Sequence, residues 1–202
     1  PHQGPGQGQA GPLAPGEAQP ALAQLGVQAG PLAGHHLLED GENLGVLLGE
    51  QEAAQGLAGE VTQSLEAVEK ALGDRERLSV AQVYVEGTTL GVIGAGVEAD
   101  IMARAGGENV FDPKAPEFKD FFAAEVSPEE IVKRAPQAIV FGVADEKDEQ
   151  RVRRYLRETF PQVPAVTEDR LVAVPQSDLY PGALGNVGAV EHIAKELYPD
   201  AF

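Results

Sequence analysis

The chain has 202 residues, which is enough for one large domain or two small ones. Its 32 acidic and 15 basic residues give a formal net charge of −17. Binding to nucleic acids or to anionic membranes depends on basic side chains that neutralise phosphate, so we expect neither as a partner. The chain contains no cysteine, which excludes disulfides, thiolate metal sites and a cysteine nucleophile.

The first 41 residues have a different composition from the rest. Residues 1–34 are rich in Gly, Pro, Gln and Ala, and Glu17 is their only charged residue. Such a stretch buries too little apolar surface to offset its chain entropy, so we assign residues 1–41 to a linker or a remnant. His35 and His36 invite a metal site, but adjacent side chains point apart on a helix or strand. We therefore predict a surface pair and no metal ligand.

Residues 42–73 are predicted to form one long connecting helix. Apolar residues recur three or four positions apart, as on one face of a helix, at Leu47, Ala54, Leu57, Val61, Leu65, Val68 and Leu72. Gly73 is a plausible end, and the helix would be about 45 Å long at 1.5 Å per residue. Gly56 and Gly59 each cost roughly 1 kcal/mol against alanine, so the helix needs packing partners. The repeat is too short to favour a coiled-coil arm.

Residues 78–202 alternate between strand and helix patterns. Strands are expected at residues 81–85, 109–111, 138–141 and 171–174, and helices at 97–105, 128–134, 148–160 and 187–197. Ser127 and Pro128 are a good helix start. This order predicts an α/β fold, a Rossmann-like three-layer lobe with a mostly parallel sheet. Ligands of such sheets meet the loops at the strand carboxyl ends, here residues 87–96, 142–147 and 175–185.

Gly94, Gly96 and Ala99 fit the dinucleotide fingerprint G-x-G-x-x-A, and Asp112 supplies an acid near the expected offset. This motif leaves open an NAD(P)- or flavin-dependent oxidoreductase that uses Gly94-Ala95-Gly96. Against it, the stretch GTTLGVI before the motif is not a clean apolar run, and a complete strand stands just upstream. The fingerprint also normally opens its domain, whereas here a long helix precedes it. We prefer a loop that enters a helix, with glycines where a Cβ atom would clash.

The order of several motifs resembles a family of transport proteins. The stretch ENLGVLLGEQEAA is similar to the start of the family's linking helix, AQVYVEG to a first strand, and GAGVEADIMARAGGENVF to a glycine-rich loop, helix and turn. VSPEEIVKRAPQAIVFG, DRLVAVP and the final ELYP also match in order. The family comprises the substrate-binding proteins of ABC importers for iron-siderophores, haem and cobalamin.

The resemblance implies a fold and a role. Family members hold a ligand between two α/β lobes joined by one long helix, so the resemblance implies a non-enzymatic, monomeric, extracytoplasmic protein, periplasmic or lipid-anchored. Its partners would be an ABC transporter permease and a metal chelate or corrinoid, with no cofactor. The resemblance covers about three quarters of the chain and lacks most of the N-terminal lobe. A fragment, or a truncated lobe without ligand, are the alternatives that this departure leaves open.

The resemblance also assigns residues. A substrate-binding wall would come from Thr88, Thr89, Gly94, Gly96, Val143, Gln176, Ser177 and Tyr180. In a haem-binding member Tyr180 could ligate iron, but it could equally be a turn aromatic that covers the core. Glu129 matches the glutamate that docks on a permease arginine, although a charge in the first turn of a helix explains it as well. These loops contain no Arg or Trp, which argues against a strongly anionic ferric catecholate.

Overall fold

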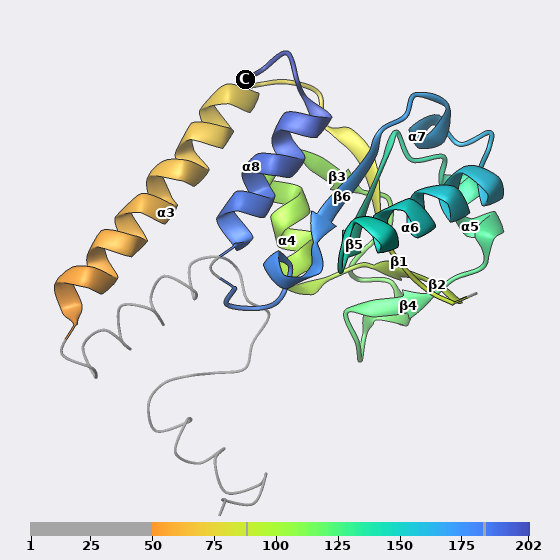
Figure 1. The fold of residues 1–202 in the computed structure, drawn as a ribbon, viewed down its shortest axis with the longest axis horizontal. Coiled ribbons are helices and arrows are strands. Elements are labelled where there is room, and N and C mark those ends of the chain that lie inside the picture. Colours follow the sequence, from red (N-terminus) through yellow and green to blue (C-terminus); the bar gives the residue numbers. More distant parts are fainter. Residues whose placement is uncertain (1–49, 88, 184) are drawn as a thin grey trace, which may run out of the picture. The chain divides into compact units, whose positions relative to one another are not determined.

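A computed structural model of the chain describes residues 50–87, 89–183 and 185–202, all within one compact unit that spans residues 32–202. A central sheet is covered by helices on both faces, with α3, α4 and α8 on one and α5, α6 and α7 on the other (Figure 1). The strands are β1 (Leu78–Glu86), β2 (Thr89–Ile93), β3 (Gly107–Asn109), β4 (Ala123–Glu125), β5 (Ala138–Val143) and β6 (Leu171–Pro175). The α-helices are α3 (Gln51–Leu72), α4 (Gly96–Arg104), α5 (Pro128–Arg134), α6 (Glu146–Thr159), α7 (Pro164–Thr167) and α8 (Asn186–Leu197). Two 3-10 turns, η1 (Pro116–Phe118) and η2 (Gln176–Asp178), complete the described elements.

The sheet is mixed, in the order β4-β2-β1-β5-β6. Strands β1, β5 and β6 are parallel, as predicted, whereas β2 is antiparallel to both β1 and β4. Val80 pairs with Asn109 of β3 and with Ala138 of β5, so β3 and β5 flank β1 on opposite edges. Strand β3 therefore occupies the first half of the edge whose second half pairs with β2.

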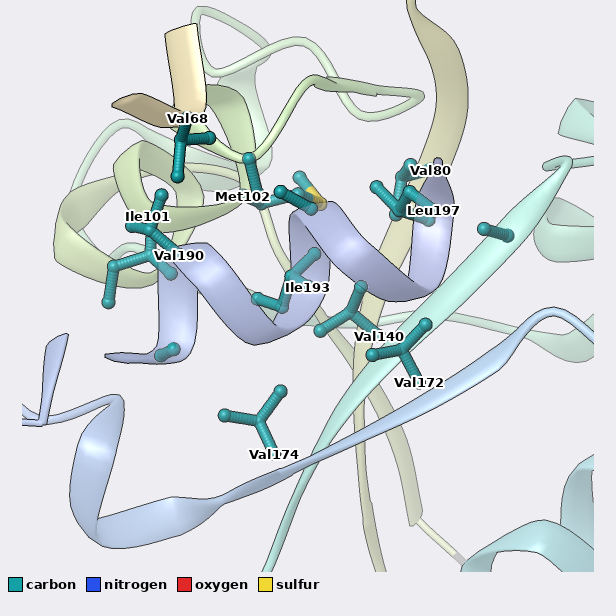
Figure 2. Packing of buried hydrophobic residues seen from close by; sticks show 14 of the residues in the cluster. Val68, Val80, Ile101, Met102, Val140, Val172, Val174, Val190, Ile193 and Leu197 are labelled. Atoms are coloured by element: carbon teal, nitrogen blue, oxygen red, sulfur yellow. The ribbon is translucent and has the colours of Figure 1, made fainter. Parts of the chain in front are cut away.

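Alternation along the strands divides the core between the two faces. Val80 and Val140 pack on α4 and α8, while Ala81 and Val83 belong to the cluster that includes residues of α5 and α6. Figure 2 shows the first cluster, in which Met102 of α4 and Ile193 of α8 lie over the strand valines. Both faces of the sheet are thus buried, which explains why the strands read as nearly continuous apolar runs.

The predicted long helix is confirmed for α3, which continues through both interior glycines and ends at Gly73 with a φ of +53°. Residues 42–49 of the predicted helix lie outside the described residues, as do residues 1–41 with His35 and His36. Within the described part of the stripe, burial is confined to the carboxyl-terminal end: Val68 and Leu72 are each 2% exposed, whereas Leu57 is 49% exposed. The helix is therefore anchored to α8 and α4 mainly by its last turns.

The later helices are confirmed within two residues of their predicted bounds. Ser127 occupies the N-cap position of α5 and Pro128 its first turn, as expected. The order of strands is confirmed for β1, β5 and β6, but the strand expected at residues 109–111 ends at Asn109. The Asn109 side chain explains this end, since it accepts from the Phe111 N–H and donates to the Ile93 carbonyl.

The interpretation of residues 87–96 as one loop is wrong. A turn at Gly87, with a φ of +61°, leads into β2, which pairs with β1 from Thr89 to Val92. Thr88, Thr89 and Gly91 interrupt the apolar pattern by which a strand is recognised, so this strand was not predicted from the sequence. Gly91 is required there because a Cβ atom would lie 1.9 Å from the Tyr84 ring.

Tyr198 explains two of the motifs that carry the resemblance. Its hydroxyl donates to the carbonyl of Gly106 over 2.8 Å and accepts from the Leu78 N–H over 2.8 Å. A Cβ atom on Gly106 would lie 2.7 Å from the Tyr198 ring, so the glycine is needed for this approach. The tyrosine after α8 thereby joins the start of β1 to the end of α4.

Candidate functional site

Tyr84 lies in a row of residues that crosses the sheet near the carboxyl ends of its parallel strands. Gly91 pairs with Tyr84 on one side and with Glu125 on its own far side. On the other side of β1 the last pair of the parallel register joins Val83 to Phe141, and the next residues along the two strands are Tyr84 and Gly142. Residues opposite one another share a face, so Glu125, Gly91, Tyr84 and Gly142 all face α4 and α8.

The two glycines of this row leave room for polar side chains. The Tyr84 ring lies across Gly91, so its phenol points toward the strand that carries Glu125. The Gln176 side chain fills the space over Gly142, where a Cβ atom would meet its Oε1 at 1.9 Å. Burial, with Glu125 and Glu86 nearby, raises the pKa of Tyr84 above 10.0. Tyr84 therefore presents a neutral phenol at neutral pH.

Gln82 precedes Tyr84 by two residues in β1, so its side chain lies on the same face of the sheet. There it contacts Glu98 of α4. The Gln82 Nε2 donates to Glu98 Oε2 over 2.6 Å, and Gln82 itself is 1% exposed. Burial raises the pKa of Glu98 to about 7, although the Gln82 amide acts in the opposite direction. Glu98 sits in the first turn of α4, where the helix dipole favours a negative charge by about 0.3–1 kcal/mol, less than one pKa unit. Burial outweighs that contribution.

The turn between β6 and α8 brings further polar groups to this end. Asn186, the first residue of α8, donates from Nδ2 to the carbonyls of Asp178 and Tyr180 over 2.6 and 3.1 Å. Ser177 is exposed and its hydroxyl donates to Asp178 Oδ1 over 3.1 Å. The Tyr180 side chain is 57% exposed, so it does not cover the core. Asn186 therefore fixes a turn that presents an exposed tyrosine.

The turn before α4 is filled by phenylalanines. The N–H groups of Gly94 and Ala95 both donate to the Phe122 carbonyl, over 2.9 and 3.2 Å. A Cβ atom on Gly94 would lie 2.6 Å from the Phe118 ring, and one on Gly96, whose φ is +80°, would lie 3.4 Å from Phe122. The first two amides are thus committed to a protein carbonyl, which argues against pyrophosphate binding here.

We call the resulting set of residues the carboxyl-end site; it comprises Gln82, Tyr84, Gly96, Glu98, Phe122, Gln176, Ser177 and Tyr180. In Figure 1 the carboxyl ends of β5 and β6 and the first turns of α4 and α8 lie along the same lower side of the view. Among the residues of this site none is basic.

The structure groups only some of the residues predicted for a substrate wall. Gly96, Gln176, Ser177 and Tyr180 belong to the carboxyl-end site. Thr89 is half-buried at the β1–β2 hairpin, one row beyond Tyr84 on the same face. Gly94 is buried under Phe118 and therefore supports the loop. Val143 packs with the cluster on the opposite face of the sheet, and Thr88 lies outside the described residues.

Four residues of the site were missed from the sequence: Gln82, Tyr84, Glu98 and Phe122. A signal for the first two existed, because Val80, Gln82, Tyr84 and Glu86 alternate with Ala81, Val83 and Val85. Polar residues at every second position of an otherwise buried strand indicate one partly polar face. Nothing in the sequence indicated that Glu98 turns inward or that Phe122 packs on Gly96.

Glu129 is exposed in the first turn of α5. Its own backbone N–H and the Ser127 hydroxyl lower its pKa. Arg134 pairs with Glu130, and no salt bridge of Glu129 occurs among the described residues. Strand β4 runs parallel to β1 and its Glu125 is level with Tyr84, so α5 begins at the same end of the sheet as the β1–β2 hairpin.

The described residues contain neither a metal-binding cluster nor a membrane-spanning helix. No group of three or more His, Cys, Asp or Glu side chains there is arranged to hold a metal ion. No helix in that part of the chain combines the length and apolar character needed to cross a membrane.

Comparison with known families decides the class. The family described as periplasmic binding protein matches residues 20–177, well over half of the chain. The chain belongs to the periplasmic binding protein family. This is a family of binding proteins, which supports a non-enzymatic role. The match begins at residue 20, inside the segment assigned to a linker or remnant. No curated protein matches the chain.

Solved structures of periplasmic binding proteins share the fold. One from Veillonella parvula superposes with a TM-score of 0.72 at 20% identity, covering 81% of this chain and 56% of that one. An Fe3+-hydroxamate transport protein from Saccharomonospora viridis gives 0.69 at 22%, covering 85% and 58%. The periplasmic heme-binding protein RhuT from Roseiflexus sp. RS-1 gives 0.70 at 19%, covering 94% and 73%. The chain thus spans little more than half the length of the first and second of these relatives.

Proposed function

We propose that this chain is the ligand-contacting C-terminal lobe, with its linking helix, of an extracytoplasmic substrate-binding protein. The protein would serve an ABC importer of an iron-siderophore, haem or a corrinoid. The observation that carries the proposal is the cluster of polar and aromatic side chains at the carboxyl ends of the sheet, in a chain of the periplasmic binding protein family. Residues 42–73 would be the linker and residues 78–202 the lobe, and the mature protein would be periplasmic or lipid-anchored.

The chemistry of the carboxyl-end site favours a neutral chelate. Its polar groups are amides, hydroxyls and the Glu98 carboxyl, and Tyr84 and Tyr180 add aromatic surface. A strongly anionic ferric catecholate would need basic partners that this set of residues does not supply. A ferric hydroxamate or a corrinoid meets the donors and acceptors present, and Tyr180 is exposed enough to reach an iron centre if the ligand is haem.

The direct test is a titration of the purified chain with a ferric hydroxamate, with haemin and with cyanocobalamin, in which binding is measured by calorimetry and by the quenching of tyrosine fluorescence. We expect one of these three ligands to bind. The double variant Gln176→Ala/Tyr180→Ala should weaken that binding by at least tenfold. Leu57→Ala, at an exposed position of α3, is the matched control and should leave affinity unchanged.

The competing oxidoreductase is tested in the same series. NAD(P)H and flavins should not bind, because the Gly94 and Ala95 N–H groups already donate hydrogen bonds to the Phe122 carbonyl. A micromolar affinity for a nicotinamide or flavin that Gly96→Val abolishes, with no affinity for any of the three chelates, would contradict the proposal.

A further inference from the structure

The Gln82 amide is buried between β1 and α4 and only half of it is satisfied. Its Nε2 donates to Glu98 Oε2 over 2.6 Å. Its Oε1 has no hydrogen-bond partner among the described residues, although Gln82 is 1% exposed. A buried polar atom without a partner destabilises a fold, so such an atom in an otherwise regular core calls for a donor.

The protonation state of Glu98 decides whether that donor exists. A charged carboxylate can only accept hydrogen bonds, and it would leave the Gln82 Oε1 facing a second acceptor. A protonated carboxyl carries one O–H donor and one carbonyl acceptor, which is the complement of a primary amide. The acid and the amide then form two hydrogen bonds with each other, of which the Nε2–Oε2 contact is one.

The surroundings of Glu98 favour the uncharged form. Burial raises its pKa to about 7, and within the described part of the chain the only opposing cause is the Gln82 amide itself. No charged group of the described residues, whether on β1, β2, β3, α3 or α8, is among the causes that shift its pKa. The other charged side chains of α4, Asp100 and Arg104, form a salt bridge with each other over 3.1 Å.

We propose that the folded lobe takes up a proton at Glu98 and that the resulting acid–amide pair with Gln82 fastens the first turn of α4 to β1. This device lies under the turn that carries Gly96, at the edge of the carboxyl-end site. Protonation removes one negative charge from that edge and satisfies the buried amide oxygen. Loss of the proton leaves one hydrogen bond and a buried charge.

The sign of the pH effect follows from the direction of the pKa change. The carboxyl group has a higher pKa in the folded chain, about 7, than its ordinary value of 4.5. The stabilisation is therefore complete below about pH 4.5 and is lost as the pH rises through about 7. Glu98→Gln mimics the protonated acid at every pH. We expect its folding equilibrium constant at pH 8 to exceed that of the unmodified chain by roughly 300-fold, and the two constants to converge below about pH 4.5.

Chemical denaturation of both chains between pH 5 and pH 8 measures this difference. Glu108→Gln, which removes one charge from an exposed site on β3, should show no such gain. The carboxyl carbon of Glu98, followed by NMR in the unmodified chain, should titrate with a midpoint near pH 7. A midpoint below about pH 5, or a Glu98→Gln chain no more stable than the unmodified one at pH 8, would overturn the proposal.

Discussion

Two glycines beside Tyr84 shape the polar end of the sheet in different ways. The ring of Tyr84 occupies the side-chain position of Gly91, whereas the flexible end of Gln176 occupies that of Gly142. A ring packed against the sheet resists displacement more than the end of a glutamine, because more buried apolar surface is lost when it moves. The same substitution at the two glycines should therefore have different consequences.

Gly91→Ala is expected to expel the Tyr84 ring and to lower the free energy of unfolding by about 1–3 kcal/mol. The pKa of Tyr84 should fall toward its ordinary value, because the burial that raises it is lost. Denaturation and an NMR titration of the tyrosine ring carbons measure the two effects. Gly142→Ala is the matched control and should cost less than about 1 kcal/mol. Equal costs at both positions would show that the ring is not held over Gly91.

At this scale the sequence predicts some positions well and others not at all. Local patterns placed Gln176 and Ser177 in a loop after a strand and Glu129 in the first turn of a helix, whereas the roles proposed for them came from the family resemblance. Tyr84 and Gln82 were missed because a run of β-branched and aromatic residues was interpreted as uniformly buried. The Glu98 side chain points toward β1 because it contacts Gln82, which lies 16 residues earlier in the chain. No local sequence pattern indicates such a contact.

Helix α3 divides into an anchored part and an exposed part. Leu72 is 2% exposed among the residues that join α3 to α4 and α8, while Leu57 is 49% exposed four turns earlier. Both belong to the apolar stripe that predicted the helix. The stripe therefore predicted the element correctly but not how much of it the lobe covers, because burial depends on tertiary contacts with α4 and α8.

The two leucines of α3 give a matched pair of substitutions. Leu72→Ala should lower the free energy of unfolding by about 2–4 kcal/mol, since it leaves a cavity in the core. Leu57→Ala should change it by less than about 0.5 kcal/mol in this chain. Urea denaturation followed by circular dichroism measures both. A large loss at Leu57 would mean that the amino-terminal half of the helix is packed against the rest of the chain.

Strand β2 shows where element prediction failed and why. Strand signals rest on apolar alternation, and here Gly91 replaces the apolar residue that the pattern requires. The glycine is explained only by the ring of Tyr84 on the neighbouring strand, which is a tertiary contact. The parallel strands β5 and β6 were predictable because they are largely buried and mostly apolar, and β1 because it is rich in β-branched and aromatic residues.

At the scale of the whole molecule, Glu129 is the residue proposed to meet the permease. It is exposed at the start of α5, on the end of the sheet that carries the β1–β2 hairpin, and Arg134 is engaged by Glu130. An arginine fork on a permease would find an open carboxylate there. In the full-length protein, Glu129→Ala should weaken docking to its permease roughly tenfold and leave ligand affinity unchanged.

The control for docking is Glu130→Ala, which removes the same charge from the adjacent position. It should leave docking unchanged, because the Glu130 carboxylate is already paired within the helix. Binding of both variants to the reconstituted permease, measured at low and at physiological salt, separates a specific contact from general charge. Equal effects of the two substitutions would reduce Glu129 to a charge that stabilises the start of α5.

The central claim is that the carboxyl-end site contacts a metal chelate or corrinoid. The most direct measurement is a map of backbone amide NMR shifts in the chain during titration with diamagnetic ligands: a gallium hydroxamate, a gallium porphyrin and cyanocobalamin. We expect one of them to shift the amide resonances near Tyr84, Gly96 and Gln176 and to leave those on the outer face of α6 unchanged. Shifts confined to α6, or none with any of the three ligands at millimolar concentration, would contradict it.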